Sequence, residues 1–389
     1  MNIVFFTHPS FLDSQSMPKF AMMLSEGMKK RGHHVSVWTP RPFFYKLPVP
    51  KKFGKWLGYI DQYLVFPFIV KYRLRKIKAN TLFVFSDQAL GPWVPLVAKF
   101  PHVIHCHDFL AQQSALNNIQ ENRITWTGKK YQSYIRNGFC KGRNFISVSN
   151  NTQKELEKFL VITPLKSGVV YNGLNQSFTA GNVSEARTFL SNQFSIPVND
   201  GYILHVGGNQ WYKNRQGVIE IYNSWCTQFN KETPLVLVGK SPAGKLLEAF
   251  NRSPFKKNIY FLSCLNDDAV KIAYKGASVF LFPSLAEGFG WPIAEAMASG
   301  CPVITTNEAP MTEVVGSAGF LINRCPSDET IVKSWANESA KVLNEVLELT
   351  ENERKLAIEN GIENAKRFDS ENALSKIEAI YSDILHPLN

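Results

Sequence analysis

Cysteine and long hydrophobic runs are both scarce in this 389-residue sequence. The six cysteines are scattered and form no C-x-x-C pair, so we expect buried free thiols in a reducing compartment. The longest hydrophobic run, residues 63–70, has eight residues, whereas a helix that crosses a bilayer needs about 20. The opening residues lack the basic leader of a signal peptide. These absences predict a soluble, cytoplasmic protein.

Negative charge is scarce in the first half only. Residues 1–175 contain 24 Lys and Arg against 8 Asp and Glu, a net charge of +16, whereas residues 176–389 have a net charge of −5. This asymmetry indicates that only the first half meets an anionic partner, either nucleic acid or a membrane surface. The basic residues contain no Gly-aromatic recognition motif, and nucleic acid would leave the acidic second half unexplained. We therefore expect no nucleic-acid partner.

The length and the order of the predicted strands indicate two α/β domains. A chain of 389 residues with 44% hydrophobic residues can bury two cores of ordinary size. Residues 1–39 follow a strand–helix–strand pattern, and a second series of strands begins at residue 201. Between them, the turn dipeptide Asn172-Gly173 coincides with the change in charge balance. We place the domain boundary near residue 175.

One stretch of the second half predicts a compact unit of a parallel sheet. A strand over 277–282 is followed by a glycine turn, a helix over 291–299 with proline in its first turn, and a strand over 301–306. Gly288 and Gly290 allow backbone N–H groups to approach a ligand closely, and the N-terminus of the helix behind them favours phosphate. The pattern predicts a phosphate-binding turn.

Two carboxylates accompany this glycine turn. Glu287 lies in the turn and Glu295 lies in the helix, with seven residues between them. Neither belongs beside a phosphate unless it has hydroxyl groups to bind, and a sugar and a ribose would supply those hydroxyls. The alternative is that Glu295 is a solvated helix residue and Gly-Phe-Gly an ordinary turn, because a lone glycine-rich turn is weak evidence.

The sequence PSLAEGFGWPIAEAMASGCPVITTNEAPMTEVVGSAG, residues 283–319, resembles the signature of retaining nucleotide-sugar glycosyltransferases of the GT-B fold, most closely glycosyltransferase family 4. Glu287 and Glu295 look like the E-x7-E motif of that family. The resemblance implies two Rossmann-like α/β domains that face each other across a cleft. It also implies transfer of a hexosyl unit with retention of anomeric configuration, and it implies neither a metal nor another cofactor.

The resemblance assigns a task to each part of the chain. Residues 176–369 are expected to bind the nucleotide-sugar donor, and the basic residues 1–175 are expected to bind the acceptor. In GT-B enzymes the last helix commonly crosses back to the first domain, so we expect the same of residues 370–389.

The same resemblance implies roles for the residues around the glycine turn. Glu295 is expected to bind the ribose hydroxyls and Glu287 the hydroxyls of the donor sugar. A nucleophilic role for Glu287 stays open beside front-face attack assisted by the leaving phosphate. Lys213 matches the lysine that clamps the donor diphosphate, but Gly208 holds the usual position of the arginine, so either Arg215 compensates or Gly208 offers only a backbone amide. Backbone amides are expected to bind the donor at Gly207, Gly208, Gly288, Phe289, Gly290 and Trp291.

A His-Cys-His-Asp sequence ends a predicted strand in the first half. It resembles the family's His-Asp motif, in which the residue corresponding to His107 faces the transferred sugar. Strand alternation puts His105 and His107 on one face, but no cysteine ligands lie nearby, so we expect no metal site. Asp108 is an expected acceptor contact. So are Asp13 and Ser16, in a loop where the family commonly has a glycine pair.

Residues 42–80 combine basic residues with aromatic and aliphatic ones. Lysines precede Trp56 and the hydrophobic run at 63–70, and a second group of Lys and Arg follows it. Interfacial membrane binding needs such cations for anionic headgroups and such apolar groups to insert. The alternative is a core helix whose lysines extend to solvent. Residues 117–143 are polar and basic without a motif, and we expect them to contact the acceptor.

Other activities remain compatible with these residues. A sugar-nucleotide 2-epimerase shares the fold and much of the donor site. An inactive sugar-nucleotide-binding relative would explain the missing arginine and glycine pair. For an enzyme of surface-polysaccharide synthesis we expect GDP-mannose as the donor, followed by a UDP-hexose, and a glycan or a lipid-linked saccharide as the acceptor.

Overall fold

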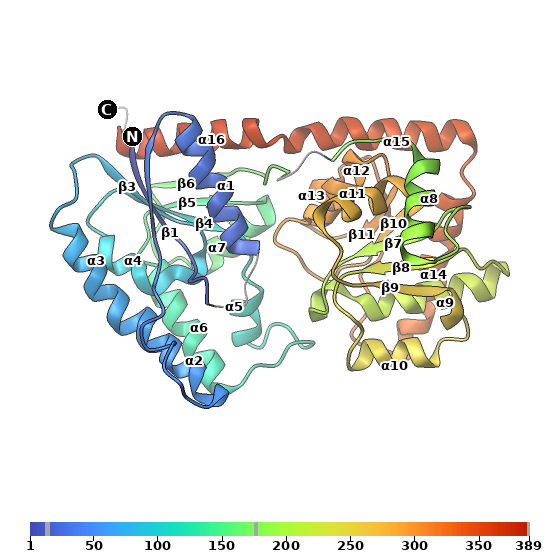
Figure 1. Ribbon diagram of the computed structural model, residues 1–389, viewed down its shortest axis with the longest axis horizontal. Coiled ribbons are helices and arrows are strands. Elements are labelled where there is room, and N and C mark those ends of the chain that lie inside the picture. The colour runs from blue at the N-terminus through green and yellow to red at the C-terminus, as the bar shows by residue number, and fades with distance from the viewer. Residues whose placement is uncertain (12–15, 175–177, 387–389) are drawn as a thin grey trace. The chain divides into compact units, whose positions relative to one another are not determined.

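A computed structural model of the chain describes residues 1–11, 16–174 and 178–386. The chain divides into two compact units, with the main division between Gly173 and Leu174 (Figure 1). The first unit comprises residues 1–119, 123–173 and the chain from Ser370 onward, and the second comprises residues 120–122 and 174–369. The predicted boundary residue 175 and the predicted acceptor residue Asp13 lie outside the described residues.

The first unit contains a six-stranded sheet in the order β2-β1-β3-β4-β5-β6, in which each neighbouring pair is parallel. Its strands are β1 (Asn2–Phe6), β2 (His34–Trp38), β3 (Thr81–Phe85), β4 (His102–Cys106), β5 (Asn144–Ser147) and β6 (Lys166–Val169). Its helices are α1 (Ser16–Lys30), α2 (Lys51–Ile60), α3 (Phe66–Leu74), α4 (Val94–Val97), α5 (Leu110–Ala115), α6 (Trp126–Phe139), α7 (Asn150–Phe159) and α16 (Ser370–Leu385), with a π-helical turn η1 (Asp61–Val65) and a 3₁₀ helix η2 (Gln88–Trp93).

The second unit repeats this architecture with a six-stranded parallel sheet in the order β12-β11-β10-β7-β8-β9. Its strands are β7 (Ile203–Val206), β8 (Leu235–Val238), β9 (Ile259–Leu262), β10 (Val279–Phe282), β11 (Val303–Thr306) and β12 (Phe320–Ile322). Its helices are α8 (Val183–Phe194), α9 (Arg215–Phe229), α10 (Lys245–Arg252), α11 (Asp267–Gly276), α12 (Trp291–Ala298), α13 (Met311–Val315), α14 (Glu329–Leu347) and α15 (Glu351–Ala365), with the 3₁₀ helices η3 (Trp211–Lys213), η4 (Lys256–Asn258) and η5 (Lys366–Phe368).

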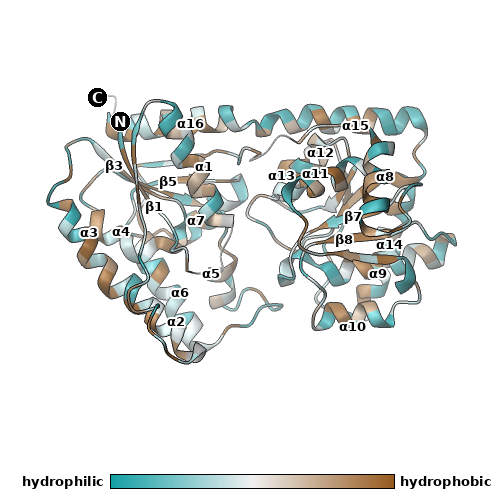
Figure 2. Cartoon of the chain, in the orientation of Figure 1, coloured by the Kyte–Doolittle hydropathy of each residue, from teal (hydrophilic) through white to brown (hydrophobic). Residues whose placement is uncertain are grey.

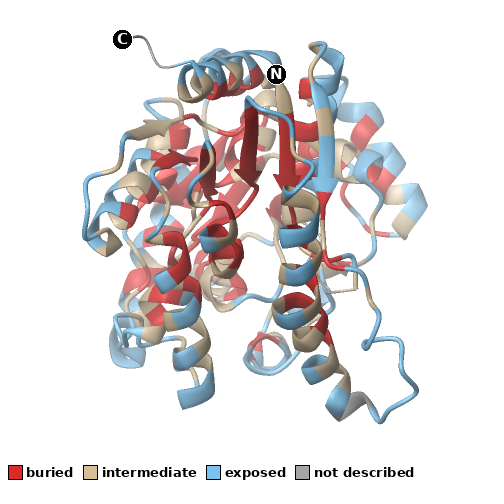
Figure 3. Ribbon diagram, turned by 90° about the vertical axis from the view of Figure 1, so that its left-hand side faces the viewer, coloured by how far each residue is buried: buried red, intermediate tan, exposed pale blue. Residues whose placement is uncertain are grey.

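Strands such as β1 in the first unit and β7 and β8 in the second consist mainly of hydrophobic residues (Figure 2). Every residue of β3 and β4 is buried, as expected for parallel strands that are covered by helices on both faces (Figure 3). In each unit, apolar residues of the central strands lie within the hydrophobic core. The same arrangement brings the carboxyl ends of the strands, and the loops that follow them, to one edge of each sheet.

The last helix, α16, packs against the first unit. Glu378 of α16 accepts hydrogen bonds from Arg31 Nη1 at 2.9 Å and from His33 Nε2 at 2.6 Å. Tyr381 is buried and its hydroxyl lies 2.6 Å from His105 Nε2. His105 is thereby engaged in the core rather than at the sheet edge.

The segment from α2 to α3 is helical throughout, where the sequence pattern predicted no definite element. Its buried residues are Gly58, Asp61, Gln62, Phe66 and Val70. Its exposed apolar residues are Phe53, Trp56, Leu64, Phe68 and Tyr72. The segment therefore buries one side and exposes aromatic and aliphatic side chains on another, with a π turn at η1 between α2 and α3. No helix in the described ranges is both long enough and apolar enough to cross a bilayer.

Helix α6 is a further element that sequence reasoning missed, because residues 117–143 show no motif. It crosses η2 at two glycines whose backbones nearly touch. A Cβ on Gly138 would lie 2.1 Å from the carbonyl oxygen of Gly91, and a Cβ on Gly91 would lie 2.2 Å from that of Ile135. Only glycine permits this close crossing, and the sequence does not reveal which two glycines meet.

Candidate active site

The glycine turn of the second unit lies between β10 and α12, at the carboxyl edge of the sheet. Gly290 is the N-cap of α12 and has a φ of +105°, a backbone conformation that favours glycine. Phe289 is buried, and its ring packs at 5.3 Å from that of Phe368. Trp291 and Pro292 begin the helix. The turn therefore presents Gly288 and Gly290 at the N-terminus of α12 while Phe289 anchors it.

Glu287 and Lys213 are in direct contact, although 74 positions separate them in the sequence. Lys213 Nζ donates a hydrogen bond of 2.8 Å to Glu287 Oε1, and the two side chains are only 14% and 9% exposed. Ser284 Oγ donates a second hydrogen bond of 2.6 Å to the same oxygen. The ammonium group also lies 5.1 Å from the centroid of the Phe282 ring. The fold thus brings together the two residues that the resemblance assigned to the diphosphate and to the donor sugar.

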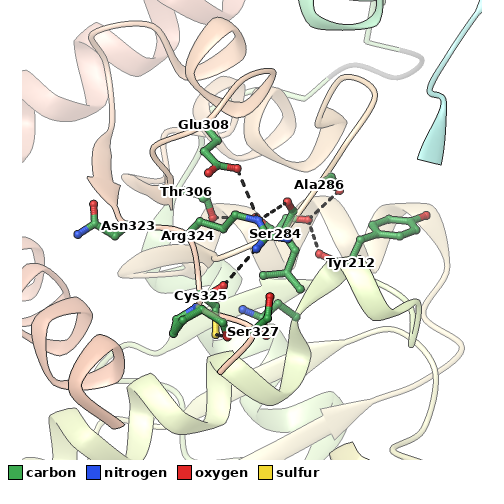
Figure 4. Close-up of polar contacts among 12 residues, drawn as sticks. Tyr212, Ser284, Ala286, Thr306, Glu308, Asn323, Arg324, Cys325 and Ser327 are labelled. Atoms are coloured by element: carbon green, nitrogen blue, oxygen red, sulfur yellow. Dashed lines mark hydrogen bonds and ion pairs between the residues drawn. The ribbon is translucent and has the colours of Figure 1, made fainter. Parts of the chain in front are cut away.

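A network of polar contacts holds the turn that carries Glu287 (Figure 4). Ser284 Oγ lies 2.7 Å from the carbonyl oxygen of Tyr212, and Thr306 Oγ1 donates to the carbonyl oxygen of Ser284 at 2.8 Å. Arg324 Nε donates to the carbonyl oxygen of Leu285 at 3.3 Å. These contacts tie the turn to η3, to β11 and to the segment after β12. Ser284 has a site role that sequence reasoning missed, although its place directly after a strand was a signal.

Glu295 lies in α12 and accepts a hydrogen bond of 2.9 Å from the hydroxyl of Tyr274. Burial raises the pKa of Glu295 to about 7, although the Tyr274 hydrogen bond and the charge of Lys213 lower it. Tyr274 is fully buried, and its ring packs at 5.3 Å from that of Phe280. Glu295 is therefore a partly buried carboxylate held by a fixed donor, not a solvated helix residue. Nothing in the sequence pattern pointed to Tyr274.

The end of β7 places Gly207 and Gly208 at the same edge of the sheet. A Cβ on Gly239, which follows β8 and has a φ of +144°, would lie 2.0 Å from the carbonyl oxygen of Gly207. Because Gly239 has no side chain, the loops that follow β7 and β8 can approach each other this closely. His205 lies beneath them, with Nδ1 donating to the carbonyl oxygen of Leu281 at 2.9 Å. Burial lowers the pKa of His205 to about 3, so the imidazole is neutral at pH 7.

Arg215, the first residue of α9, is buried, with only 4% of its surface exposed. Its Nη1 donates to Asn209 Oδ1 and, at 2.6 Å, to the carbonyl oxygen of Lys240. Burial lowers the pKa of Arg215 to about 10. The guanidinium thus holds the loops after β7 and β8 together, and a direct contact between Arg215 and a diphosphate stays a prediction.

The first unit places His107 and Asp108 just after β4. His107 is buried, its Nε2 donates to the carbonyl oxygen of Ser86 at 2.9 Å, and burial lowers its pKa below the usual range. Asp108 Oδ1 accepts from the backbone amide of Leu110 at 3.1 Å. Ser16 is the first residue of α1. The predicted roles of His107, Asp108 and Ser16 stay predictions.

The described residues contain no group of three or more His, Cys, Asp and Glu arranged to hold a metal ion. His105 and His107 turn to separate partners, Tyr381 and Ser86.

Two family models match the chain in succession. Residues 17–178 match the model described as Glycosyltransferase Family 4, and residues 186–364 match the model described as Glycosyl transferases group 1. Together the two matches support a glycosyltransferase of the family 4 type. The predicted family is confirmed.

Curated relatives of this chain include two bacterial mannosyltransferases. The O-antigen chain mannosyltransferase B of Escherichia coli is 30% identical over 178 residues, which are 45% of this chain and 44% of that protein. The O-antigen chain mannosyltransferase RfbU of Salmonella typhimurium is 28% identical over 197 residues, which are 50% of this chain and 49% of that protein. The chain thus spans about half the length of these curated relatives.

Solved structures match the chain over nearly its whole length. The sucrose-phosphate synthase of Thermosynechococcus elongatus has a TM-score of 0.73 at 17% identity, covering 98% of this chain and 99% of that one. Anabaena HepE in complex with UDP and glucose has a TM-score of 0.71 at 18% identity, covering 98% and 100%. Together with the two parallel six-stranded sheets, these matches confirm the GT-B fold.

Proposed function

We propose that the chain is a retaining hexosyltransferase that moves a hexosyl unit from a nucleoside-diphosphate sugar to a glycan or lipid-linked acceptor in surface-polysaccharide or glycoconjugate synthesis. The contact between Lys213 and Glu287 beside the N-terminus of α12 carries the proposal. It places one cation, one carboxylate and a glycine turn within reach of a single sugar diphosphate. The matches to the two glycosyltransferase family models support the same reading.

The proposed chemistry depends on how the leaving diphosphate is stabilised. As the bond from the anomeric carbon to the diphosphate breaks, negative charge grows on the phosphate oxygens. Lys213 and the amides of the turn are preorganised to bind that charge, and no metal is needed for it. Glu287 binds hydroxyls of the donor sugar, and Glu295 binds the ribose hydroxyls. The acceptor hydroxyl attacks the same face and its proton passes to the leaving phosphate. A covalent intermediate on Glu287 is the alternative.

The relatives support a choice between two candidate donors. Both curated relatives named above are mannosyltransferases, which favours GDP-mannose for this chain. HepE was solved with UDP and glucose, which keeps a UDP-hexose as the second candidate.

Thermal unfolding in the presence of GDP, UDP, ADP or dTDP, each with and without magnesium, tests the donor site. A ligand at about 100 times its Kd adds about 2.7 kcal/mol to the free energy of unfolding. We expect one diphosphate, GDP first, to raise the unfolding midpoint equally with and without magnesium. An increase that requires magnesium would contradict metal independence. No increase with any of the four would favour an inactive relative. Conversion of the donor sugar without an acceptor would identify a 2-epimerase instead.

The surface of residues 41–80 supports a peripheral position on the cytoplasmic face of a membrane. This stretch contains ten Lys and Arg and one acidic residue, Asp61. Asp61 is buried and accepts hydrogen bonds from the backbone amides of Phe44 and Tyr45, so its charge is turned inward. Trp56 and Phe68 are 62% and 71% exposed in the same stretch. Cations beside exposed apolar side chains are what binding to an anionic bilayer surface requires.

The double variant Trp56→Ser with Phe68→Ser is expected to abolish most of the binding to vesicles of phosphatidylglycerol and phosphatidylcholine. Each substitution removes an exposed apolar side chain and leaves the cations in place. Co-sedimentation at low salt measures the bound fraction. The matched control, Ile331→Ser with Leu356→Ser, changes exposed apolar residues of the second unit and is expected to bind like the wild type. Failure of the wild type to sediment with these vesicles would end the membrane proposal.

A further inference from the structure

His8 and Asp87 are paired at the carboxyl edge of the first sheet. They follow the neighbouring parallel strands β1 and β3, in which Phe6 is in register with Phe85. Both residues therefore lie two positions beyond a matched pair and face the same way. His8 Nε2 is 2.8 Å from Asp87 Oδ2. Nothing in the local sequence indicates this pair, because 79 positions separate its members.

Asp87 is buried and carries its charge into the pair. Its side chain is 9% exposed, and its Oδ1 accepts a hydrogen bond of 2.8 Å from the amide of Ala89 at the start of η2. Burial raises the pKa of Asp87. The hydrogen bond from His8, the electrostatic interactions with His8 and His107 and the hydrogen bond from the Ala89 amide together lower it by more, so the pKa of Asp87 lies below the usual range. An ionised carboxylate only accepts hydrogen bonds, so Nε2 of His8 must donate.

This donation places the proton of a neutral His8 imidazole on Nε2. A neutral imidazole with its proton on Nε2 has a lone pair on Nδ1. The side chain of His8 is 16% exposed, and no residue in the described ranges forms a hydrogen bond with Nδ1. Thr39 Oγ1 donates to the carbonyl oxygen of His8 at 3.1 Å and so fixes its backbone. The result is an oriented hydrogen-bond acceptor at the sheet edge.

His107 lies close to the same pair. The charge of Asp87 acts on His107, and β4, which ends directly before His107, is the next strand beyond β3. His107 donates its Nε2 proton to Ser86, the residue before Asp87. The sheet therefore gathers two imidazoles around one buried carboxylate.

We propose that His8, oriented by Asp87, binds the acceptor by receiving a hydrogen bond from one of its sugar hydroxyls at Nδ1. Asp87 is a positioning residue that acts through His8. The acceptor class is a saccharide whose free hydroxyl group reaches the edge formed by β1, β3 and β4. The inference rests on the proposed glycosyl transfer and adds to it the group that selects and orients the acceptor.

Two variants separate this role from a purely structural one. Asp87→Asn can still accept the Ala89 amide, but it then offers an N–H group to His8 Nε2, which moves the imidazole proton to Nδ1. His8→Gln keeps a donor for Asp87 and removes the Nδ1 lone pair. His34→Gln, at an exposed position in β2, is the matched control.

Nitrogen-15 NMR of the full chain with labelled histidine reads the tautomer directly, with His8 assigned by the signal lost in His8→Gln. We expect Nε2-protonated His8 in the wild type and Nδ1-protonated His8 in Asp87→Asn. Titration with methyl α-mannopyranoside and methyl α-glucopyranoside is expected to shift the His8 Nδ1 signal of the wild type only. If neither glycoside shifts it, or if Asp87→Asn leaves the tautomer unchanged, the inference is overturned.

Transfer from the donor to octyl α-mannoside supplies a second readout. In His8→Gln and Asp87→Asn we expect kcat/KM for the acceptor to fall about tenfold or more, while the diphosphate that stabilises the wild type raises their unfolding midpoints equally. His34→Gln is expected to behave like the wild type. Wild-type acceptor kinetics in both variants would overturn the role of His8. Loss of the diphosphate response in the wild type would instead overturn the proposed function.

Discussion

Replacing Lys213 with alanine is expected to lower kcat by about 100-fold or more, the effect of removing one preorganised group that stabilises transition-state charge. Lys213 is well placed for this because its ammonium group is held between Glu287 and the Phe282 ring and is only 14% exposed. In such a site a cation interacts with a developing phosphate charge more strongly than in bulk water. Steady-state kinetics with a saturating donor measures the effect.

The fold should survive this substitution. Ser284 still donates to Glu287 in the variant, so that carboxylate keeps one partner. The control is Lys231→Ala, which removes a partly exposed lysine paired with Glu348 elsewhere in the second unit. Exposed ion pairs contribute about 0–1 kcal/mol, so we expect this variant to keep wild-type kinetics. A wild-type rate in Lys213→Ala would remove Lys213 from the site.

Glu295→Ala is expected to weaken binding of the preferred nucleoside diphosphate by about 10- to 100-fold, because hydrogen bonds to a charged group contribute about 1.5–3 kcal/mol. Isothermal titration calorimetry gives the affinity directly. Unchanged affinity for the free diphosphate would show that Glu295 does not bind the ribose. This titration needs neither turnover nor an acceptor, so its result does not depend on which acceptor the enzyme uses.

The raised pKa of Glu295 gives a second signature of the same contact. The carboxylate form accepts the ribose hydroxyls, so affinity should fall as the pH drops through about 7, and binding near pH 7 should release a proton. Tyr274→Phe removes the hydrogen bond that favours the charged form, so the midpoint of this pH dependence should move upward. Glu295→Gln should show neither proton release nor the pH dependence. Calorimetry in two buffers of different ionisation enthalpy measures the released proton.

The free energy of unfolding should depend on pH in the opposite direction to the ligand affinity. The pKa of Glu295 is higher in the folded chain than its usual value of 4.5, so the folded state holds a proton that the unfolded state has lost between about pH 4.5 and 7. The contribution of this group to the free energy of unfolding is therefore complete below pH 4.5 and decreases as the pH rises to about 7. Glu295→Gln should remove that decrease, and unfolding with denaturant across this pH range tests it.

Part of the candidate donor site could be predicted from local sequence. Helix α12 begins at Trp291 as expected, directly after the two glycines. The turn and the elements on either side of it are determined by short-range signals, namely glycine, proline and apolar runs of strand length. The contacts among the site residues could not be predicted from such short-range signals. Ser284 and Tyr274 are ordinary residues in the sequence and become site residues only because of what they touch.

Residues 42–80 show the limit of local reasoning. The sequence left open whether the apolar residues there belong to a core helix or to an exposed surface. The structure divides them, burying Phe66 and Val70 in the core of the first unit and exposing Trp56 and Phe68 on the same helical segment. Which side of a helix meets the core is decided by the elements packed against it, and the local sequence does not reveal them.

The sequence alone was enough to predict the glycine turn with its two glutamates, since these residues lie close together in the chain. The resemblance carried by that stretch implied the family and the GT-B fold. Tertiary structure alone decided which side chains meet. It paired Lys213 with Glu287, Tyr274 with Glu295, and His8 with Asp87. It also buried the side chain of Arg215. The physical reason is that parallel strands bring distant loops to one edge of a sheet, and burial there sets the charge and hydrogen bonding of each group.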